Sequence, residues 1–109
     1  MKTQLPNPFV HVGGYRRLAP QQIIRLVADR NYTLIYETNG RNFLVSTTLK
    51  VIEGRLKAYG FVRINRGMII NMAFVKMIWK DGTIQLTDGT KVYPSRRRQG
   101  ILRENALLP

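Results

Sequence analysis

Positively charged side chains are the largest group of residues that could do chemistry in this sequence of 109 residues. The chain has 18 Lys and Arg against 6 Asp and Glu, which gives a formal net charge of +12 at pH 7. The densest run is Ser95-Arg96-Arg97-Arg98. A surface this positive attracts polyanions, so nucleic acid, an anionic membrane surface and an acidic protein are the candidate partners.

Catalytic chemistry has little support in the sequence. There is no cysteine and His11 is the single histidine, which excludes a disulfide, a thiolate zinc site, a cysteine nucleophile and a His-rich metal site. No pair of acidic residues has a spacing that forces two carboxylates together, and no Gly-x-x-x-x-Gly-Lys phosphate loop is present. We therefore expect no enzymatic activity, no catalytic residue, no metal site and no cofactor.

The length and the apolar segments indicate one domain that does not enter a membrane. Hydrophobic residues make up 44% of the chain, enough for a core, and residues 1–109 fit a single domain. Within it we expect a flexible N-terminal segment at residues 1–9 and a tail at residues 105–109. The longest apolar stretch, residues 67–75, is too short to cross a bilayer, and no secretory signal is visible, so we expect a cytoplasmic location.

Short β-strands joined by tight turns must position most of the basic residues. Asn39-Gly40 and Asp81-Gly82 are residue pairs that tolerate positive φ, so each predicts a hairpin between its flanking apolar runs. These hairpins join residues 32–37 to 41–45 and residues 75–79 to 83–86. The runs 91–93 and 23–28 add further strands, and residues 9–12 could form an edge strand. The fold class is therefore mainly β, with antiparallel sheets.

Two helices complete the predicted elements. Apolar residues spaced three, four and three apart form one helical stripe, made of Leu49, Ile52, Leu56 and Tyr59. Residues 46–48 offer an N-cap for this amphipathic helix, and Gly60 offers a stop. A short C-terminal helix is expected to begin after Ser95 as its N-cap and to run to about residue 103.

Three segments on this scaffold could contact a polyanion. Residues 29–32 form a polar turn that can hydrogen-bond to phosphates or base edges, although an ordinary turn with a packed Tyr32 fits equally well. Residues 63–67 place two arginines and an amide between apolar runs, for which a solvated strand edge is the simpler interpretation. Residues 95–98 place guanidinium groups at the positive end of a helix, which costs folding stability and favours anion binding. For this last segment we prefer a functional interpretation.

The aromatic residues are expected mainly in the core rather than as stacking platforms. Trp79 alternates with apolar neighbours on one face of a predicted strand, and Tyr32 does the same on another. Phe43, Phe61 and Phe74 fall within apolar runs.

The order of motifs from about residue 24 to residue 103 resembles the LytTR family of bacterial DNA-binding domains. The matching motifs are Asn31-Tyr32, Thr48-Leu49, Phe61-x-Arg63-x-Asn65-Arg66-Gly67, Ile70-Asn71 and Tyr93-Pro94-Ser95-Arg96-Arg97. Two positions depart from the family pattern, because Asn65 stands where the family usually has His and Gly67 where it usually has Ser. The resemblance implies an elongated antiparallel β domain whose loops, rather than a recognition helix, enter the major groove at successive turns of DNA.

The resemblance also implies roles for individual residues. The expected base-contacting residues are Asn31, Tyr32, Asn65, Arg66 and Arg97. The expected phosphate-contacting residues, chosen mainly for their charge, are Arg30, Lys50, Arg63, Ser95, Arg96 and Arg98. The buried-looking Asn71 also matches the family motif, but we assign it to the structure of a turn.

The function expected from the residues and the resemblance is sequence-specific binding of double-stranded DNA by a bacterial transcriptional regulator. The protein is then a monomer or a weak dimer in solution, with two copies on paired direct repeats. Two alternatives stay open on the sequence alone. One is a basic β module that binds RNA through exposed aromatic residues, and the other is an interaction module for an acidic protein partner.

Overall fold

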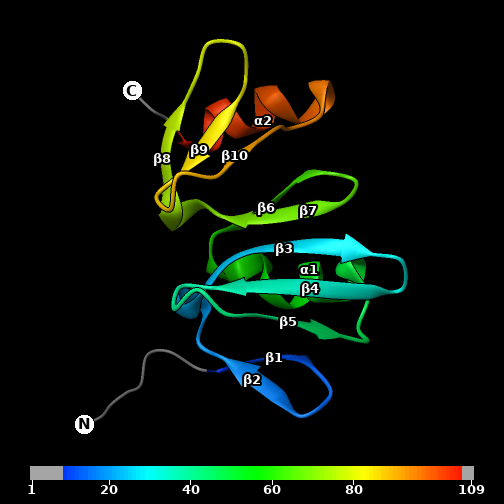
Figure 1. Cartoon of the computed structure of the whole chain (residues 1–109). Coiled ribbons are helices and arrows are strands. Elements are labelled where there is room, and N and C mark those ends of the chain that lie inside the picture. Colours follow the sequence, from blue (N-terminus) through cyan, green and yellow to red (C-terminus); the bar gives the residue numbers. More distant parts are fainter. Residues whose placement is uncertain (1–8, 107–109) are drawn as a thin grey trace, which may run out of the picture.

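The structure, a computed structural model, describes residues 9–106 and contains three antiparallel sheets and two α-helices (Figure 1). The mainly β fold expected from the sequence is confirmed. The N-terminal segment expected at residues 1–9 lies almost wholly outside the described residues, as does the end of the expected tail, residues 107–109.

The central sheet has five strands in the order β5-β4-β3-β7-β6. Its strands are β3 (Ile23–Asp29), β4 (Tyr32–Glu37), β5 (Asn42–Val45), β6 (Phe61–Asn65) and β7 (Met68–Asn71). The β4–β5 pair is the hairpin predicted around Asn39-Gly40, and Gly40 has the positive φ of 88° that the turn requires. Strands β3 and β7 pair antiparallel, which joins two hairpins into one sheet.

A second sheet, with the order β10-β9-β8, lies beside the first (Figure 1). It consists of β8 (Val75–Ile78), β9 (Ile84–Leu86) and β10 (Lys91–Val92). Both of its turns are held by an aspartate that accepts a backbone N–H two residues on, Asp81 from Thr83 and Asp88 from Thr90, each at 2.9 Å. The predicted hairpin and its third strand are therefore confirmed.

The third sheet is a hairpin of two short strands, β1 (Val10–Gly13) and β2 (Arg16–Leu18). The first of these strands agrees with the expected edge strand, while the sequence analysis did not predict the second. A 3₁₀ turn, Pro20–Gln22, leads from β2 into the central sheet.

The two predicted helices are both present, with small differences. Helix α1 spans Leu49–Leu56 and continues as a 3₁₀ turn, Lys57–Tyr59, which ends at Gly60 with φ 84°. Leu49, Ile52 and Leu56 are buried as expected, but Tyr59 is exposed because the tighter turn rotates it off the apolar stripe. Thr48 precedes α1 without a side-chain capping bond. Helix α2 spans Arg96–Ala106, three residues beyond its expected end.

Two hydrophobic cores lie on opposite faces of the central sheet. Adjacent residues of one strand point to opposite faces, and on β7 Ile69 belongs to one core while Ile70 belongs to the other. The first core packs against α1 and the β1–β2 hairpin, and the second packs against the β8–β10 sheet and α2. Asn71, buried as expected, donates to the carbonyls of Pro20 and Ile23 and accepts from the N–H of Ala73, so the structural role assigned to it is confirmed.

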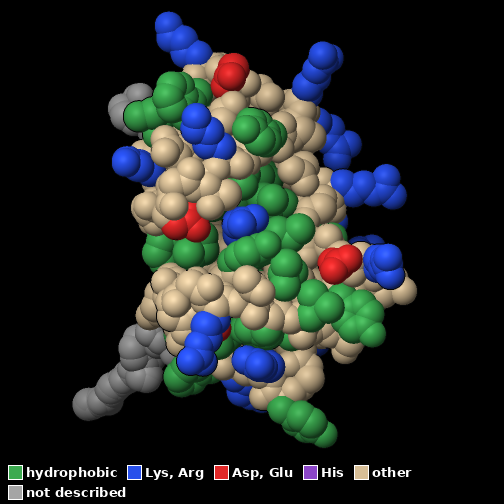
Figure 2. Space-filling view, in the orientation of Figure 1, with side chains coloured by type: hydrophobic (Ala, Val, Ile, Leu, Met, Phe, Trp, Pro, Cys, Tyr) green, Lys and Arg blue, Asp and Glu red, His purple; other side chains and the backbone are tan. Residues whose placement is uncertain are grey.

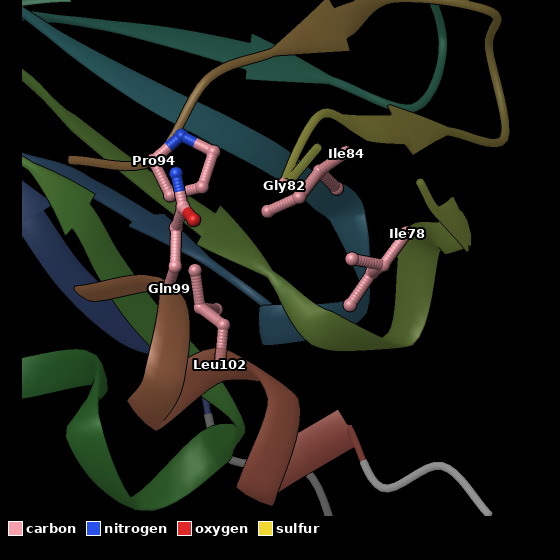
Figure 3. A pocket seen from close by; sticks show the side chains of 6 residues that line it. All are labelled: Ile78, Gly82, Ile84, Pro94, Gln99 and Leu102. Carbon is pink, nitrogen blue, oxygen red and sulfur yellow. The ribbon is translucent and has the colours of Figure 1, made fainter. Parts of the chain in front are cut away.

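The second core fixes α2 in place through close packing at the β8–β9 turn. Figure 3 shows Gln99 and Leu102 of α2 facing Pro94, Gly82 and Ile84. A Cβ atom on Gly82 would lie only 2.7 Å from the Gln99 side chain. The start of α2 therefore packs directly against the β8–β9 turn, where a larger residue at position 82 would have to displace the Gln99 side chain.

Candidate nucleic-acid interface

The three segments singled out in the sequence lie at the same end of the central sheet. These are the turn between β3 and β4, the turn between β6 and β7, and the start of α2, all on the right in Figure 1. Backbone hydrogen bonds join them, because the N–H of Ala28 donates to Gly67 at 2.8 Å and the N–H of Ser95 donates to Ile64 at 2.8 Å. The sheet thus holds the three segments in a fixed relative position.

The β3–β4 turn presents its polar side chains to solvent. Asp29 pairs with Tyr32, so the loop consists of Arg30 and Asn31 alone, and Arg30 takes the positive φ of 61° that such short turns require. Arg30 and Asn31 are exposed, and Tyr32 is 47% exposed. Tyr32 is therefore not packed as the alternative of an ordinary turn expected, and the side chains of this turn face solvent.

In the β6–β7 turn, Asn65 is engaged within the protein. Its amide NH₂ donates to the Tyr93 carbonyl at 2.9 Å, and its amide oxygen accepts the N–H of Gly67 at 2.8 Å. These bonds close the turn and tie it to the segment that leads into α2. Arg66, at the tip, is exposed.

Arg63 also makes contacts inside the protein. Its guanidinium donates to Glu53 of α1 at 3.0 Å, and it also donates to the carbonyls of Asn65 and Arg66. Only 18% of its side chain is exposed. The simpler interpretation of residues 63–67, a solvated strand edge, therefore does not describe Arg63, whose side chain supports the turn.

The start of α2 brings four arginines around one open groove. The groove has a volume of about 490 Å³ and is lined by Arg63, Asn65, Arg66, Ser95, Arg97 and Arg98. Arg98 donates to the Arg63 carbonyl at 2.6 Å, which joins α2 to the end of β6. Arg96 and Arg97 are exposed. The helix dipole and the arginines both make this groove a place where a phosphate or another acceptor is stabilised.

Basic charge extends along the same edge of the molecule. Lys50, exposed in the first turn of α1, adds to it, and Figure 2 shows Lys and Arg side chains projecting from the right-hand edge. Three of the acids have partners within the protein: Glu53 pairs with Arg63, and Asp81 and Asp88 hold the turns of the β8–β10 sheet. Hydrogen bonding from Thr83 lowers the pKa of Asp81. Burial raises the pKa of Asp88, but the hydrogen bonds from Thr90 and the charge of Arg25 together lower it more.

Two features at this end were missed in the sequence analysis. One is the contact of Glu53 with Arg63, because a residue on a helix and one on a strand share no periodicity. The other is the β1–β2 hairpin, whose single signal was the pair Gly13-Gly14 followed by basic residues.

Comparison with known proteins agrees with this geometry. The family model of the LytTr DNA-binding domain matches residues 13–106. The chain therefore belongs to the LytTR family of DNA-binding domains. Membership of this family supports DNA binding as part of a regulator.

A solved structure shares the fold. It is a LytTr DNA-binding domain from Bacillus cereus, which is 18% identical to this chain and superposes with a TM-score of 0.73, over 93% of this chain and 96% of the other. The search of curated proteins found no match.

Among residues 9–106 no helix is both long and apolar enough to pass through a membrane. The same residues contain no group of three or more His, Cys, Asp or Glu that could hold a metal ion.

Proposed function

We propose that this protein binds double-stranded DNA sequence-specifically, as a bacterial transcriptional regulator, through the loops at one end of its central sheet. The observation that carries the proposal is the groove in which Arg66 and Arg97 meet, next to the exposed β3–β4 turn. Arginines around an open groove are suited to both phosphate and guanine, since the guanidinium can donate two parallel hydrogen bonds.

We divide the candidate residues into two groups, according to their exposure and their bonds within the protein. In our proposal Arg97, Arg66, Asn31 and Tyr32 read base edges. Groups nearby hold phosphates, namely the exposed Arg30, Lys50 and Arg96 and the half-buried Ser95. A second group positions the first through bonds within the protein, and it consists of Asn65, Arg63 and Arg98. The sequence analysis assigned Asn65 to reading bases and Arg63 and Arg98 to holding phosphates. In our proposal all three residues instead support the loops.

The size of the molecule sets how much DNA one copy can contact. Its longest dimensions are 40 Å, slightly more than one turn of B-DNA, about 34–36 Å. Loops at the two ends of the basic edge can therefore reach successive major grooves on one side of the duplex. We place the protein in the cytoplasm, where bacterial DNA lies, with two copies side by side on direct repeats and no enzymatic activity.

RNA binding is the second candidate, because aromatic residues are exposed on the outer face of the β8–β10 sheet. Trp79 is 44% exposed and Tyr93 63% exposed, so the expectation that Trp79 lies in the core is wrong. Lys91 lies 5.3 Å from the Trp79 ring centroid, where a cation and an aromatic surface could hold a single-stranded base.

Selection of binding sites from a random duplex library tests the DNA proposal. We expect a recovered motif with G·C pairs at positions read by arginine, and tighter binding of that duplex than of single-stranded DNA or structured RNA at fixed salt. Preferred binding of single strands or RNA would favour the second candidate. Retention of an acidic protein partner after nuclease treatment, without any nucleic-acid preference, would instead favour an interaction module.

A further inference from the structure

The β1–β2 hairpin carries exposed basic side chains that the proposed interface does not use. Residues 10–18 contain two arginines and no acid. Arg16 and Arg17 are exposed, and Tyr15 at the tip is fully exposed. Gly13 and Gly14 allow this tip to form, with φ of 146° and 56°.

The hairpin tip lies at the same end of the central sheet as the proposed DNA-binding loops. A Cβ atom on Gly13 would lie 2.8 Å from Cβ of Val45, and Val45 pairs with Thr33, immediately after the β3–β4 turn. The Thr33 hydroxyl also donates to the Thr47 carbonyl at 2.7 Å, which fixes the end of β5 there. In Figure 1 the β1–β2 turn lies on the right, on the same side as the other loops.

Packing holds the hairpin and the charge of Arg16 in place before any ligand binds. The Arg16 guanidinium stacks over the Phe43 ring, 3.9 Å from its centroid. The His11 ring spans the tip, with Nε2 2.7 Å from the Gly14 carbonyl oxygen. From α1, Arg55 donates to the His11 carbonyl at 3.2 Å and adds a third positive charge to this end of the hairpin. The pre-organised charges lower the entropy cost of binding an anion.

We propose that the β1–β2 hairpin is a further contact to the phosphate backbone of double-stranded DNA, made mainly by Arg16 and Arg17. This inference rests on the proposed function and extends the interface beyond its three loops, along the same edge of the molecule and away from α2 (Figure 1). Phosphate contacts carry no sequence information, so the hairpin adds affinity and fixes the orientation of the protein on the duplex.

Salt-dependent binding to duplex DNA tests the inference, with the full chain and the Arg16→Gln/Arg17→Gln variant. Each phosphate contact contributes about 0.9 to the slope of log affinity against log salt. We therefore expect the double variant to reduce the slope by up to about 1.8, with equal losses on the selected site and on random duplex. The Arg16→Lys/Arg17→Lys variant, which keeps both charges, should retain most of the slope.

A matched control removes two charges from the other end of the molecule. Arg41, before β5, and Lys57, after α1, are exposed, and both elements have those ends on the left in Figure 1. Arg41→Gln/Lys57→Gln should leave the slope unchanged. In hydroxyl-radical footprints, Arg16→Gln/Arg17→Gln should shorten the protected region at one end only.

The outcomes separate this inference from the proposed function. An unchanged slope and footprint for Arg16→Gln/Arg17→Gln, or an equal effect of the control variant, would overturn the hairpin contact while leaving the three-loop interface intact. Failure of the unmodified protein to protect any duplex would overturn the proposed function and the hairpin contact with it.

Discussion

Arg97 and Lys50 both carry an exposed positive charge, but they stand at different kinds of position. Arg97 lines the groove beside the β6–β7 turn, and Lys50 lies on the outer surface of α1. We expect Arg97→Ala to weaken binding to the selected site by about 1–3 kcal/mol and to relax specificity at one base pair. Lys50→Ala should weaken all sequences alike and reduce the salt slope by about 1.

Titrations with the selected duplex, its single-base variants and random duplex measure both effects. Arg97→Ala and Lys50→Ala each remove one positive charge. Any additional loss of specificity in Arg97→Ala is therefore due to the loss of a base contact and not to the loss of charge. Equal losses on selected and random DNA for Arg97→Ala would contradict its role in reading a base.

Arg63 and Arg66 are three residues apart in one hairpin. The structure predicts that removing Arg63 lowers stability, whereas removing Arg66 weakens DNA binding. Arg63 is mostly buried and donates to Glu53 and to two carbonyls of the turn, whereas Arg66 is exposed at the tip. Arg63→Ala should lower the free energy of unfolding by about 1–3 kcal/mol, since it leaves acceptors in the turn without a donor. Arg66→Ala should change that energy by less than about 0.5 kcal/mol and weaken DNA binding.

Urea denaturation of both variants, followed by DNA titration at a temperature where both are folded, distinguishes these effects. If Arg63→Ala were as stable as the unmodified protein and only lost affinity for DNA, Arg63 would be a direct phosphate contact after all.

At this scale the sequence was informative about residue type and less so about role. The charge excess and the turn motifs selected Arg66, Arg97 and the β3–β4 turn, which the structure leaves exposed. They also selected Asn65 and Arg63, whose side chains are used inside the protein. The difference lies in partners distant along the chain, such as the Tyr93 carbonyl for Asn65, and no local pattern indicates these.

Among the helices and strands too, the sequence predicted those features that depend on neighbouring residues and not those that depend on contacts between distant segments. Asn39-Gly40 and Asp81-Gly82 fixed two hairpins because the turn conformation is a property of those residues themselves. The three-four-three spacing likewise identified α1. The pairing of β3 with β7, the split into two cores and the position of the β1–β2 hairpin depend on contacts between distant segments, so the residues alone did not predict them.

Gly82 allows a prediction about how one element positions another. A side chain at position 82 would destabilise the protein in two ways. The backbone has a positive φ of 96°, and the Cβ atom would lie 2.7 Å from the side chain of Gln99 in α2. Gly89 has a similar φ of 90° but nothing within 4 Å of the same position. We expect Gly89→Ala to lower the free energy of unfolding by about 1–2 kcal/mol through backbone strain alone, and Gly82→Ala to lower it further.

Thermal denaturation of the two variants measures this difference, and the addition of Gln99→Ala to Gly82→Ala should recover the excess. Because α2 carries Arg97, Gly82→Ala should also weaken DNA binding while Gly89→Ala does not. Equal stability losses in the two variants would show that Gln99 moves aside without cost.

For the whole molecule, the basic edge and the size of the domain together limit how two copies can share one DNA. A copy 40 Å long occupies more than one helical turn of about 34–36 Å. Neighbouring copies on the same side of the duplex therefore cannot have centres one turn apart. The nearest arrangement that keeps both basic edges facing the same side is two turns, about 21 base pairs.

We therefore predict that cooperative binding to two direct repeats is strongest at a centre-to-centre spacing of about 21 base pairs. Inserting about 5 base pairs turns the second repeat to the opposite side of the helix, so cooperativity should disappear while the affinity for each single repeat stays the same. Quantitative footprinting of a spacing series, with each repeat also measured alone, provides the measurement. Absence of cooperativity at every spacing would mean that the two copies do not contact each other on DNA. A maximum at one turn would mean that the protein does not lie along the duplex as its basic edge indicates.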